Sequence, residues 1–276
     1  MQPAAAGWRA RLALRFAAAD RRTVLVQRSH SGPLQVQRPF YDAGGVCQIY
    51  ILHPPGGVVG GDELFIDVTC EPRARALLTT PAAGKLYRSR GPTAHITQTL
   101  RAAAGATLEW LPQESIAYAG AQVRACTRVE LAGDAGFIGW EILCLGRPAS
   151  GEAFTHGQYS QRLEVWRDDR PLYLEHGRCA GASPLLAEDW GLAGQPVTAT
   201  LVCAAARTVA LEPLRAVAED CNGDELLGVS QLRDALVCRY RGPSAQRARA
   251  LFIRLWSLLR PAVLNAAAAP PRIWHS

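Results

Sequence analysis

The stretch VRACTRVEL, residues 123–131, decides the fold class of this chain. Its odd-numbered positions, from Val123 to Leu131, are mostly apolar, while Arg124, Arg128 and Glu130 occupy even-numbered positions. Successive side chains of a β-strand point to opposite faces, so this alternation is typical of a strand with one face on a core and the other in water. The stretch therefore predicts a half-buried β-strand.

The same kind of pattern recurs on both sides of this stretch. Leu64, Ile66 and Val68 alternate with polar residues, and the apolar segments that flank residues 168–171 (DDRP) predict a hairpin. Further strands are predicted at 23–27, 46–52, 74–79, 94–100, 106–111, 137–145, 197–203 and 235–240. Because turn-rich segments with glycine or proline separate most of these strands, the pattern predicts an all-β sandwich, barrel or solenoid.

Two segments near the C-terminus have helical spacing instead. Residues 210–220 place three apolar side chains on one face, and residues 244–260 repeat apolar side chains between arginines. Ser244 is a predicted N-cap, and Pro261 is predicted to end the second helix. Without a linker or a clean repeat, the sequence predicts one domain over residues 1–276. Its β-rich body covers about 23–205, and a small two-helix element lies within about 206–276.

Composition describes a globular protein with an excess of cations. Hydrophobic residues make up 49% of the 276 residues, charged residues make up 20%, and the net charge is +6. The cations are spread along the chain without a dense basic run or interleaved aromatic residues. This distribution favours solubility or the steering of an acidic partner and argues against nucleic-acid binding.

The cysteines and the N-terminus bear on the cellular compartment. The eight cysteines form no C-x-x-C pair and lie mostly in apolar stretches, so buried reduced thiols are expected rather than a disulfide framework. Arg15 and Arg21 interrupt any apolar segment of a signal peptide, and no uncharged run is long enough to span a membrane. The sequence predicts a cytoplasmic protein that does not act at a membrane.

Two signatures stand out in the N-terminal third, LHPPGGVVGGD (residues 52–62) and TTPAAGKLYRS (residues 79–89). Neither fits the phosphate-binding pattern G-x-x-x-x-G-K-[ST], so a tight turn that presents Asp62 is expected in place of a nucleotide site. Lys85 is the only lysine among 30 basic residues, which suggests a place for a compact ammonium group. The predicted motif positions are Gly56, Gly57, Gly60, Gly61, Thr79, Thr80, Lys85, Tyr87 and Arg88.

Four carboxylates lie within or beside apolar stretches: Asp62, Glu114, Glu141 and Glu175. Burial of a carboxylate is costly unless it is paired, hydrogen-bonded or metal-bound. A structural ion pair with an arginine such as Arg147 explains any one of them, whereas the four together suggest a polar path through the interior. His176, beside Glu175, adds a nitrogen that suits a transient Ni²⁺ or Zn²⁺ contact.

The motifs of common catalytic and metal sites are missing. The six histidines and eight cysteines have no zinc-site spacing, and no G-x-S-x-G elbow or Cys–His signature is present. Asp168 and Asp169 suggest a paired-carboxylate glycosidase, but aspartates are also common in hairpin turns. No catalytic residue and no tight metal site are therefore predicted.

Several motifs together resemble the UreD (UreH) family of urease accessory proteins. Besides the two signatures, they are LEWLPQESIAY (108–118), LGRPASGEAFTHG (145–157), DELLGVSQLRDALVCRYRG (224–242), RLWSLLRP (254–261) and PPRIW (270–274). They occur in the family's order and cover about residues 23–274. The resemblance adds Arg147, Arg272 and Trp274 to the predicted partner-binding or structural positions.

The resemblance implies a mainly β fold, with an irregular helix-like stack of strands and a small helical element. It implies a non-enzymatic maturation factor that binds apo-urease and UreF, and through UreF the GTPase UreG, in a complex that is dimeric through UreF. Transient Ni²⁺ would pass through an internal polar tunnel, with Asp62 and Glu175 as the first candidates, Glu141 and Glu114 next, and no tightly bound cofactor. A carbohydrate-active enzyme on a β-solenoid and a standalone nickel-binding protein remain the alternatives.

One departure from the family pattern lies after the last predicted helix. A glycine is common there, whereas this chain has Asn265 followed by a run of four alanines. Asparagine tolerates the left-handed backbone conformation that ends many helices, so the turn is expected to persist.

Overall fold

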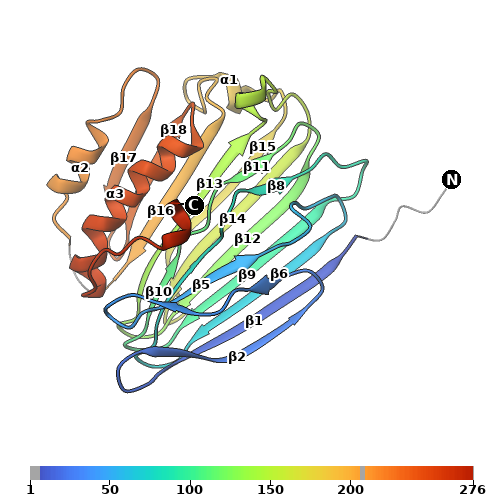
Figure 1. The fold of residues 1–276 in the computed structure, drawn as a ribbon. Helices are drawn as coiled ribbons and strands as arrows, with labels where there is room; N and C mark the ends of the chain where they lie inside the picture. Colours follow the sequence, from blue (N-terminus) through green and yellow to red (C-terminus); the bar gives the residue numbers. More distant parts are fainter. Residues whose placement is uncertain (1–6, 206–208, 276) are drawn as a thin grey trace.

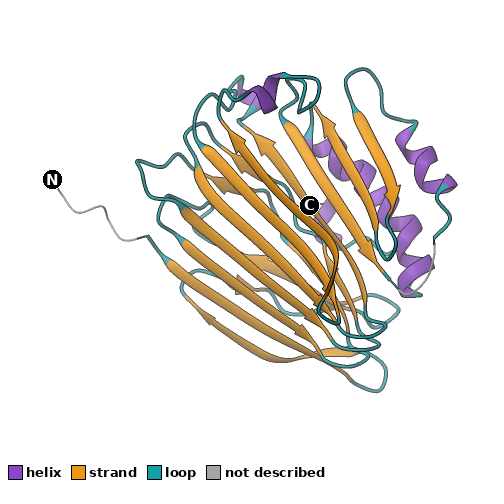
Figure 2. Cartoon of the chain, turned by 180° about the vertical axis from the view of Figure 1, so that it is seen from behind, coloured by secondary structure: helices purple, strands orange, loops and turns teal. Residues whose placement is uncertain are grey.

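The computed structural model describes residues 7–205 and 209–275, and stacked β-strands are its main secondary structure (Figures 1 and 2). The longer strands are β1 (Arg9–Ala18), β2 (Thr23–Ser31), β5 (Cys47–Leu52), β6 (Glu63–Cys70), β7 (Arg75–Thr79), β9 (Ala94–Ala102), β10 (Thr107–Trp110), β12 (Gln122–Leu131), β13 (Gly136–Leu145), β14 (Gln158–Arg167), β15 (Arg170–Ala180), β16 (Val197–Ala204), β17 (Leu226–Gln231) and β18 (Leu236–Gly242). The short ones are β3 (Gln35–Val36), β4 (Phe40–Tyr41), β8 (Gly84–Leu86) and β11 (Ser115–Ala117). The helical segments are η1 (Pro148–Ser150), α1 (Pro184–Ala187), α2 (Glu212–Ala218), α3 (Ala245–Leu264) and η2 (Arg272–His275).

The strands form two sheets that pack face to face. The first sheet has the order β15-β14-β12-β9-β6-β1-β2, and the main path of the second is β17-β18-β16-β13-β10-β7-β5-β3. Apolar side chains from the facing sides of both sheets, such as Ile66, Leu100 and Leu143, share one buried core. The helices α2 and α3 cover the other side of the second sheet, at one end of the molecule (Figure 2).

The chain winds through both sheets in successive parallel coils. β6, β9, β12 and β14 pair in parallel in the first sheet, and β5, β7, β10 and β13 do so in the second. The short strands β8 and β11 pair in parallel with each other, and β11 also pairs in parallel with β13 of the second sheet. Leu64, Ile96, Ala125 and Gln161 take equivalent positions on consecutive coils. This stack confirms the predicted β-helix-like fold, and the coil recurs in space without a sequence repeat.

Antiparallel hairpins close both ends of the first sheet. β1 pairs with β2 at one end, and β14 pairs with β15 at the other. The turn of the second hairpin is Asp168–Asp169, with φ of 46° and 60°, a left-handed pair that suits the twist of a two-residue hairpin turn. The hairpin predicted from the sequence is therefore confirmed, and these two aspartates serve the turn.

The strand β1 was missing from the predicted strands, which began at residue 23. Its sequence RARLALRFAA alternates exposed and buried positions, with Ala10, Leu12, Leu14 and Phe16 inside the core. The alternation was readable from the sequence. Its parallel pairing with β6, which follows more than forty residues later in the chain, was not, because sequence pattern alone does not encode a long-range neighbour.

The end of α3 also differs from the prediction. Ser244 is the N-cap, as predicted, and its Oγ accepts a hydrogen bond from the Arg247 backbone N–H at 3.2 Å. Pro261 lies inside the helix, which ends at Leu264, so the predicted end at Pro261 is wrong. Proline removes one N–H, and the burial of Val263 and Leu264 beyond it compensates for that loss. Asn265 then ends the helix with φ of 49°, which confirms the left-handed turn.

A buried ion cluster fastens α3 to the second sheet. The Arg260 guanidinium is fully buried and donates from Nε to both oxygens of Glu109 on β10, at 3.0 and 3.1 Å. Its Nη2 donates to Asp42 Oδ2 at 2.9 Å, and Trp256 Nε1 donates to Glu109 Oε2 at 2.6 Å. The helix is thus fixed by charge pairing as well as by apolar packing.

The cysteines and the length of the helices are the remaining features of the fold. All eight cysteines are free, and five of them are buried. In the part of the chain that the structure describes, none of the helices has the length and apolar character to cross a lipid bilayer.

Candidate functional site: the cavity between the sheets

A cavity of about 460 Å³ lies between the two sheets near the loops that precede β6 and β9. Most of its wall is apolar, with Ile51, Ile66, Trp110 and Leu143 among its residues. One part of the wall is polar and consists of Gln98, Thr127, Glu141 and Gln161, which come from β9, β12, β13 and β14. Four strands that are distant in sequence therefore place one polar group each around a common space.

Glu141 is the only Asp or Glu in the wall of this cavity, so far as the chain is described. Its two oxygens accept hydrogen bonds from Thr127 Oγ1 and from Gln161 Nε2. Burial raises the pKa of Glu141 to about 7, against the opposing effect of the Thr127 hydrogen bond, and the nearby charge of Glu175 raises it further. Neutral donors alone thus leave this carboxyl half-protonated near neutral pH.

The hydrogen bonds of Thr127 also allow Glu141 to be protonated or ionised. Its Oγ1 has one proton but lies within hydrogen-bond distance of both Glu141 Oε1 and Gln98 Oε1, the latter at 2.7 Å. A protonated Glu141 that donates to Thr127, or a Gln98 amide turned to present its NH₂ group, supplies the second proton. The cluster can therefore hold either a neutral or an ionised carboxyl by moving one proton and one amide.

The two glycine-rich signatures meet at the mouth of the cavity. Val58 and Leu86 form a parallel bridge, in which the Val58 N–H donates to Lys85 O and the Tyr87 N–H donates to Val58 O, each at 2.8 Å. A Cβ at Gly57 would lie 2.3 Å from the Tyr87 ring, so only glycine permits this approach. The sequence did not reveal that the two segments are stacked coils of one rim.

The mouth also carries two nitrogen groups, Lys85 and His53. Lys85 is exposed and has no ion-pair partner among the described residues. Burial lowers the pKa of His53, and the charge of Asp62 opposes this shift. His53 is therefore mostly neutral at pH 7 and offers a lone pair at the entrance, a role that the sequence analysis did not assign to it.

The structure separates the carboxylates that were predicted to line one path. Asp62 is buried, and its oxygens accept backbone N–H groups of Trp8 at 2.8 Å and Val59 at 2.9 Å, so it fastens the turn before β6. Glu114 lies 3.5 Å from Arg249 Nη1. Only Glu141 lines the cavity itself.

Glu175 lies on the inner side of β15, beyond Glu141. It pairs with Arg239 Nη2 at 2.9 Å and accepts a hydrogen bond from the Tyr173 hydroxyl at 3.0 Å. Its charge acts on Glu141, which shows that the two carboxylates are near each other. Glu175 therefore extends the polar wall toward β18, with its charge compensated by an arginine.

His176 lies on the opposite face of β15 from Glu175, because adjacent residues of a strand point to opposite sides. It is 60% exposed, and its Nε2 lies 3.2 Å from Glu164 Oε1 on the outer face of the first sheet. The structure therefore does not bring His176 and Glu175 together.

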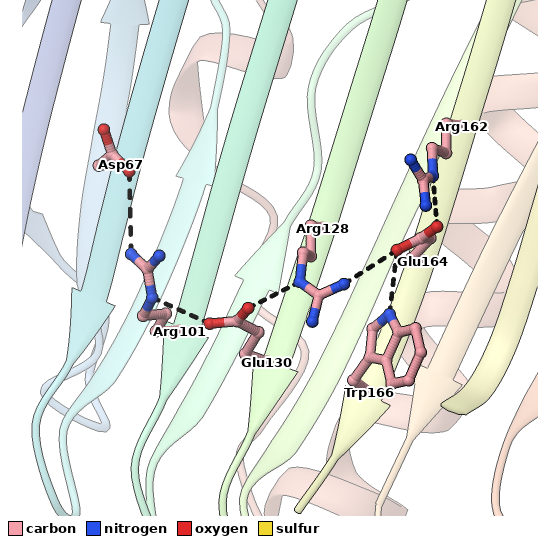
Figure 3. Close-up of polar contacts among 7 residues, drawn as sticks. All are labelled: Asp67, Arg101, Arg128, Glu130, Arg162, Glu164 and Trp166. Carbon is pink, nitrogen blue, oxygen red and sulfur yellow. Dashed lines mark hydrogen bonds and ion pairs between the residues drawn. The ribbon is translucent and has the colours of Figure 1, made fainter. Parts of the chain in front are cut away.

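That outer face carries a ladder of ion pairs across four strands, which we call the outer ladder (Figure 3). Its members, in order across the strands, are Asp67, Arg101, Glu130, Arg128, Glu164 and Arg162, and Trp166 Nε1 donates to Glu164 as well. Alternating charges neutralise one another along it. The outer ladder pairs three arginines with carboxylates of the chain itself.

The remaining predicted motif residues have structural contacts. Thr79 Oγ1 donates to Leu111 O at 2.6 Å, and Thr80 Oγ1 accepts the Gln113 N–H at 2.9 Å. The Tyr87 and Tyr118 rings pack edge to face, and the Arg147 guanidinium lies 4.6 Å from the Tyr118 ring centroid. Gly56, Gly60 and Gly61 shape the turn, with φ of 79° at Gly56 and 93° at Gly61, and Arg88 bridges to Ala121 in the neighbouring coil.

The C-terminal PPRIW segment is anchored to the second sheet. Trp274 Nε1 donates to Thr79 Oγ1 at 2.9 Å, and the Trp274 ring packs against Trp140 and Trp256. Arg272 is exposed beside it. Trp274, one of the predicted partner-binding or structural positions, therefore has structural contacts within the chain.

The cavity favours transient over tight binding of a cation. Within the described residues no three His, Cys, Asp or Glu side chains lie close enough together to hold a metal ion. One carboxyl with amide and hydroxyl oxygens offers hard but weak ligands. The sequence analysis missed Gln98, Thr127 and Gln161, although each is a polar residue at an inward-facing position of its strand, which is the signal that could have revealed them.

Together these features define the class by its architecture: a β-solenoid-like stack of parallel coils with an internal polar site and a helical cover on one sheet. Comparison with known proteins gives the family. A model of the UreD urease accessory protein family matches residues 8–275, and the chain belongs to this family.

Individual relatives are similar over nearly their whole length. The chain is 50% identical over 274 residues to the urease accessory protein UreD of Azoarcus sp. (strain BH72), covering 98% of this chain and 95% of that protein. It is 48% identical over 272 residues to the UreD protein of Pseudomonas aeruginosa, covering 98% and 95%, and 44% identical over 274 residues to that of Alcanivorax borkumensis, covering 98% and 93%. The family places this protein in urease maturation.

Proposed function

We propose that this protein is a non-catalytic scaffold that binds apo-urease and UreF, and through UreF the GTPase UreG, and that nickel passes through the cavity between its sheets on the way to urease. The observation that carries the proposal is the ring of Gln98, Thr127, Glu141 and Gln161 inside an otherwise apolar cavity. Four inward polar groups from four different strands are costly to bury and do not stabilise a core better than apolar groups would.

The proposed path begins at His53 and Lys85, crosses the polar wall at Glu141 and continues toward Glu175. Neutral His53 offers nitrogen to an arriving cation, and ionised Glu141 offers oxygen inside. A site with one carboxyl and neutral oxygens holds the ion weakly, which a conduit requires because tight ligands would retain the ion. Asp62 supports this path indirectly by fixing the rim, and Glu114 lies beside it.

Closing the cavity tests the proposal. Ala125 lines the cavity, whereas Cys126, the next residue of β12, lies on the outer face of the same sheet. Ala125→Phe is expected to lower the nickel content and the activity of co-expressed urease at least tenfold, and Cys126→Phe is the matched control. Equal nickel content with both variants, when each still co-purifies with urease, would remove the cavity from the path.

A chain-deletion experiment tests the coarser role. Cells that express urease without this protein are expected to contain urease subunits with little nickel. Nickel-replete urease in its absence would overturn the maturation role itself.

The alternatives have less support. A glycosidase needs two carboxyl groups that face one groove, and Glu141 is alone in the cavity wall so far as the chain is described. A nickel-storage protein needs a closed set of ligands, and the described residues contain no such cluster.

A further inference from the structure

The loop between β15 and β16 presents the most exposed large apolar side chain of the described residues, Trp190, at 72% exposure. It follows the short helix α1 at one end of the sheets (Figure 1). An exposed tryptophan contributes nothing to a monomer core, and tryptophan is among the residues that most often dominate the energy of protein interfaces.

The backbone around Trp190 is fixed although its side chain is free. Arg241 Nη1, on β18, donates to Asp189 O at 2.7 Å and to Gly191 O at 2.8 Å, the two carbonyls that flank Trp190. The Gly191 N–H donates to Glu188 O at 2.9 Å, which closes the turn. A side chain held on a rigid backbone loses little conformational entropy when a partner covers it.

A second apolar side chain lies beside this loop. Leu226, on the edge strand β17, is 53% exposed and is the register partner of Arg241. Register partners in an antiparallel pair point to the same face, so Leu226 lies next to the arginine that holds the Trp190 loop. Leu227, the following residue, is buried under the helices and holds the strand in place.

Exposed carboxylates adjoin both residues of this pair in sequence, and the guanidinium of Arg241, which holds the loop, is a cation beside them. Glu188, Asp189 and Asp224 are exposed and flank Trp190 and Leu226 in sequence. None of the three has an ion-pair partner among the described residues, whereas the outer ladder pairs its carboxylates with arginine. Unpaired carboxylates around an apolar anchor complement a pocket with a basic rim.

We infer that Trp190 and Leu226 form an anchor for a protein partner that offers an apolar pocket rimmed by arginine or lysine. The inference rests on the proposed function in one respect, because that function names UreF and apo-urease as the partners to test. It assigns the docking surface to the end of the molecule that carries β17, β18 and α1, not to the charged outer face of the first sheet.

The test uses purified UreF and purified apo-urease, each titrated separately with the full-length protein. Trp190→Ala is expected to weaken the binding of one of them at least tenfold, and Leu226→Ser to weaken the same one. Trp8→Ala is the matched control, because Trp8 is also exposed, at 56%, but lies at the far N-terminal strand; its affinity is expected within twofold of wild type. The double charge reversal Glu188→Lys/Asp189→Lys is expected to weaken the same complex and to reduce its salt dependence.

The outcomes separate the two proposals. Unchanged affinity of Trp190→Ala for both partners, with wild type binding at least one, would overturn the anchor and leave the proposed function intact. Failure of wild type to bind either partner would overturn both. Self-association that Trp190→Ala abolishes would show that a second copy of the chain occupies the surface, and would likewise overturn the assignment to a basic partner.

Discussion

The outer ladder and the cavity wall each contain one shielded glutamate, and the two are in opposite states. Glu164, on the outer face, has a side chain only 3% exposed, yet its pKa lies at about 2. Glu141, inside the cavity, has a pKa of about 7. Burial acts in the same direction on both carboxyls, so burial does not decide between these states.

The difference lies in the donors. Burial would raise the pKa of Glu164, but hydrogen bonds from Arg162, His176 and Trp166 and the charge of Arg162 lower it. Thr127 and Gln161 give Glu141 hydrogen bonds without a positive charge. A carboxyl surrounded by guanidinium groups is a fixed structural anion, whereas one among neutral donors can gain and lose a proton near pH 7.

The largest effect that tests this comparison is expected at Glu109, a glutamate that is 1% exposed and is paired with Arg260. Arg260→Ala leaves the charges of Glu109 and Asp42 without a partner and should lower the free energy of unfolding by about 3–5 kcal/mol. Denaturant unfolding measures this change. Arg254→Ala, which removes a half-exposed pair with Asp220 at the surface of the same helix, should cost less than about 1 kcal/mol. Equal costs would mean that burial of the pair is irrelevant.

A smaller effect is expected in the outer ladder itself. Glu164→Gln should lower the free energy of unfolding by about 1–2 kcal/mol at pH 7, a figure reduced for the exposure of the surrounding arginines. The folded-state pKa is depressed, so the stabilisation by Glu164 is complete above the unfolded-state pKa near 4.5 and is lost as the pH falls toward 2. The difference between variant and wild type should therefore vanish across that window. A difference independent of pH would show that shape, not charge, matters at this position.

The smallest effect is expected in the cavity, with the opposite sign. Glu141→Gln should stabilise the protein by about 1 kcal/mol at pH 8 and by nothing near pH 4. The folded-state pKa is raised, so between about 4.5 and 7 the unfolded chain binds fewer protons, and wild-type stability falls as the pH rises through this window. Thermal or denaturant unfolding at several pH values measures the trend. A wild-type protein that gains stability over the same window relative to the variant would contradict it. High salt should reduce the change in the free energy of unfolding caused by Glu164→Gln and leave the change caused by Glu141→Gln unaltered.

Much of the fold was predictable from the sequence, because strand alternation is local. The half-buried strand at 123–131, the turn at Asp168–Asp169 and the cap at Ser244 are each set by a few neighbouring residues, and all are confirmed. The same locality explains two of the differences. β1 alternates as clearly as β12, but it pairs with a strand that is distant in sequence. Pro261 lies within α3, whose last turn is stabilised by burial, and the position of a proline in the sequence does not reveal that burial.

The candidate site was less predictable. The sequence named Glu141 as one of four carboxylates and ranked it behind Asp62, which holds backbone N–H groups, and Glu175, which pairs with Arg239. It placed His176 beside Glu175, where the strand turns the two apart. Gln98 and Gln161 occupy inward-facing positions of their strands. Their place in the cavity wall can be inferred only when the residues that neighbour them on adjacent coils are known.

The sequence by itself determined which segments become strands, which residues of each strand face inward, and the family, since all of these depend on patterns that short segments carry. Only the tertiary structure decided which carboxyl can gain and lose a proton near pH 7, which arginines form ion pairs, and which tryptophan is left exposed. The physical reason is that ionisation and exposure depend on distances between groups on different coils, and those distances exist only once the coils are stacked.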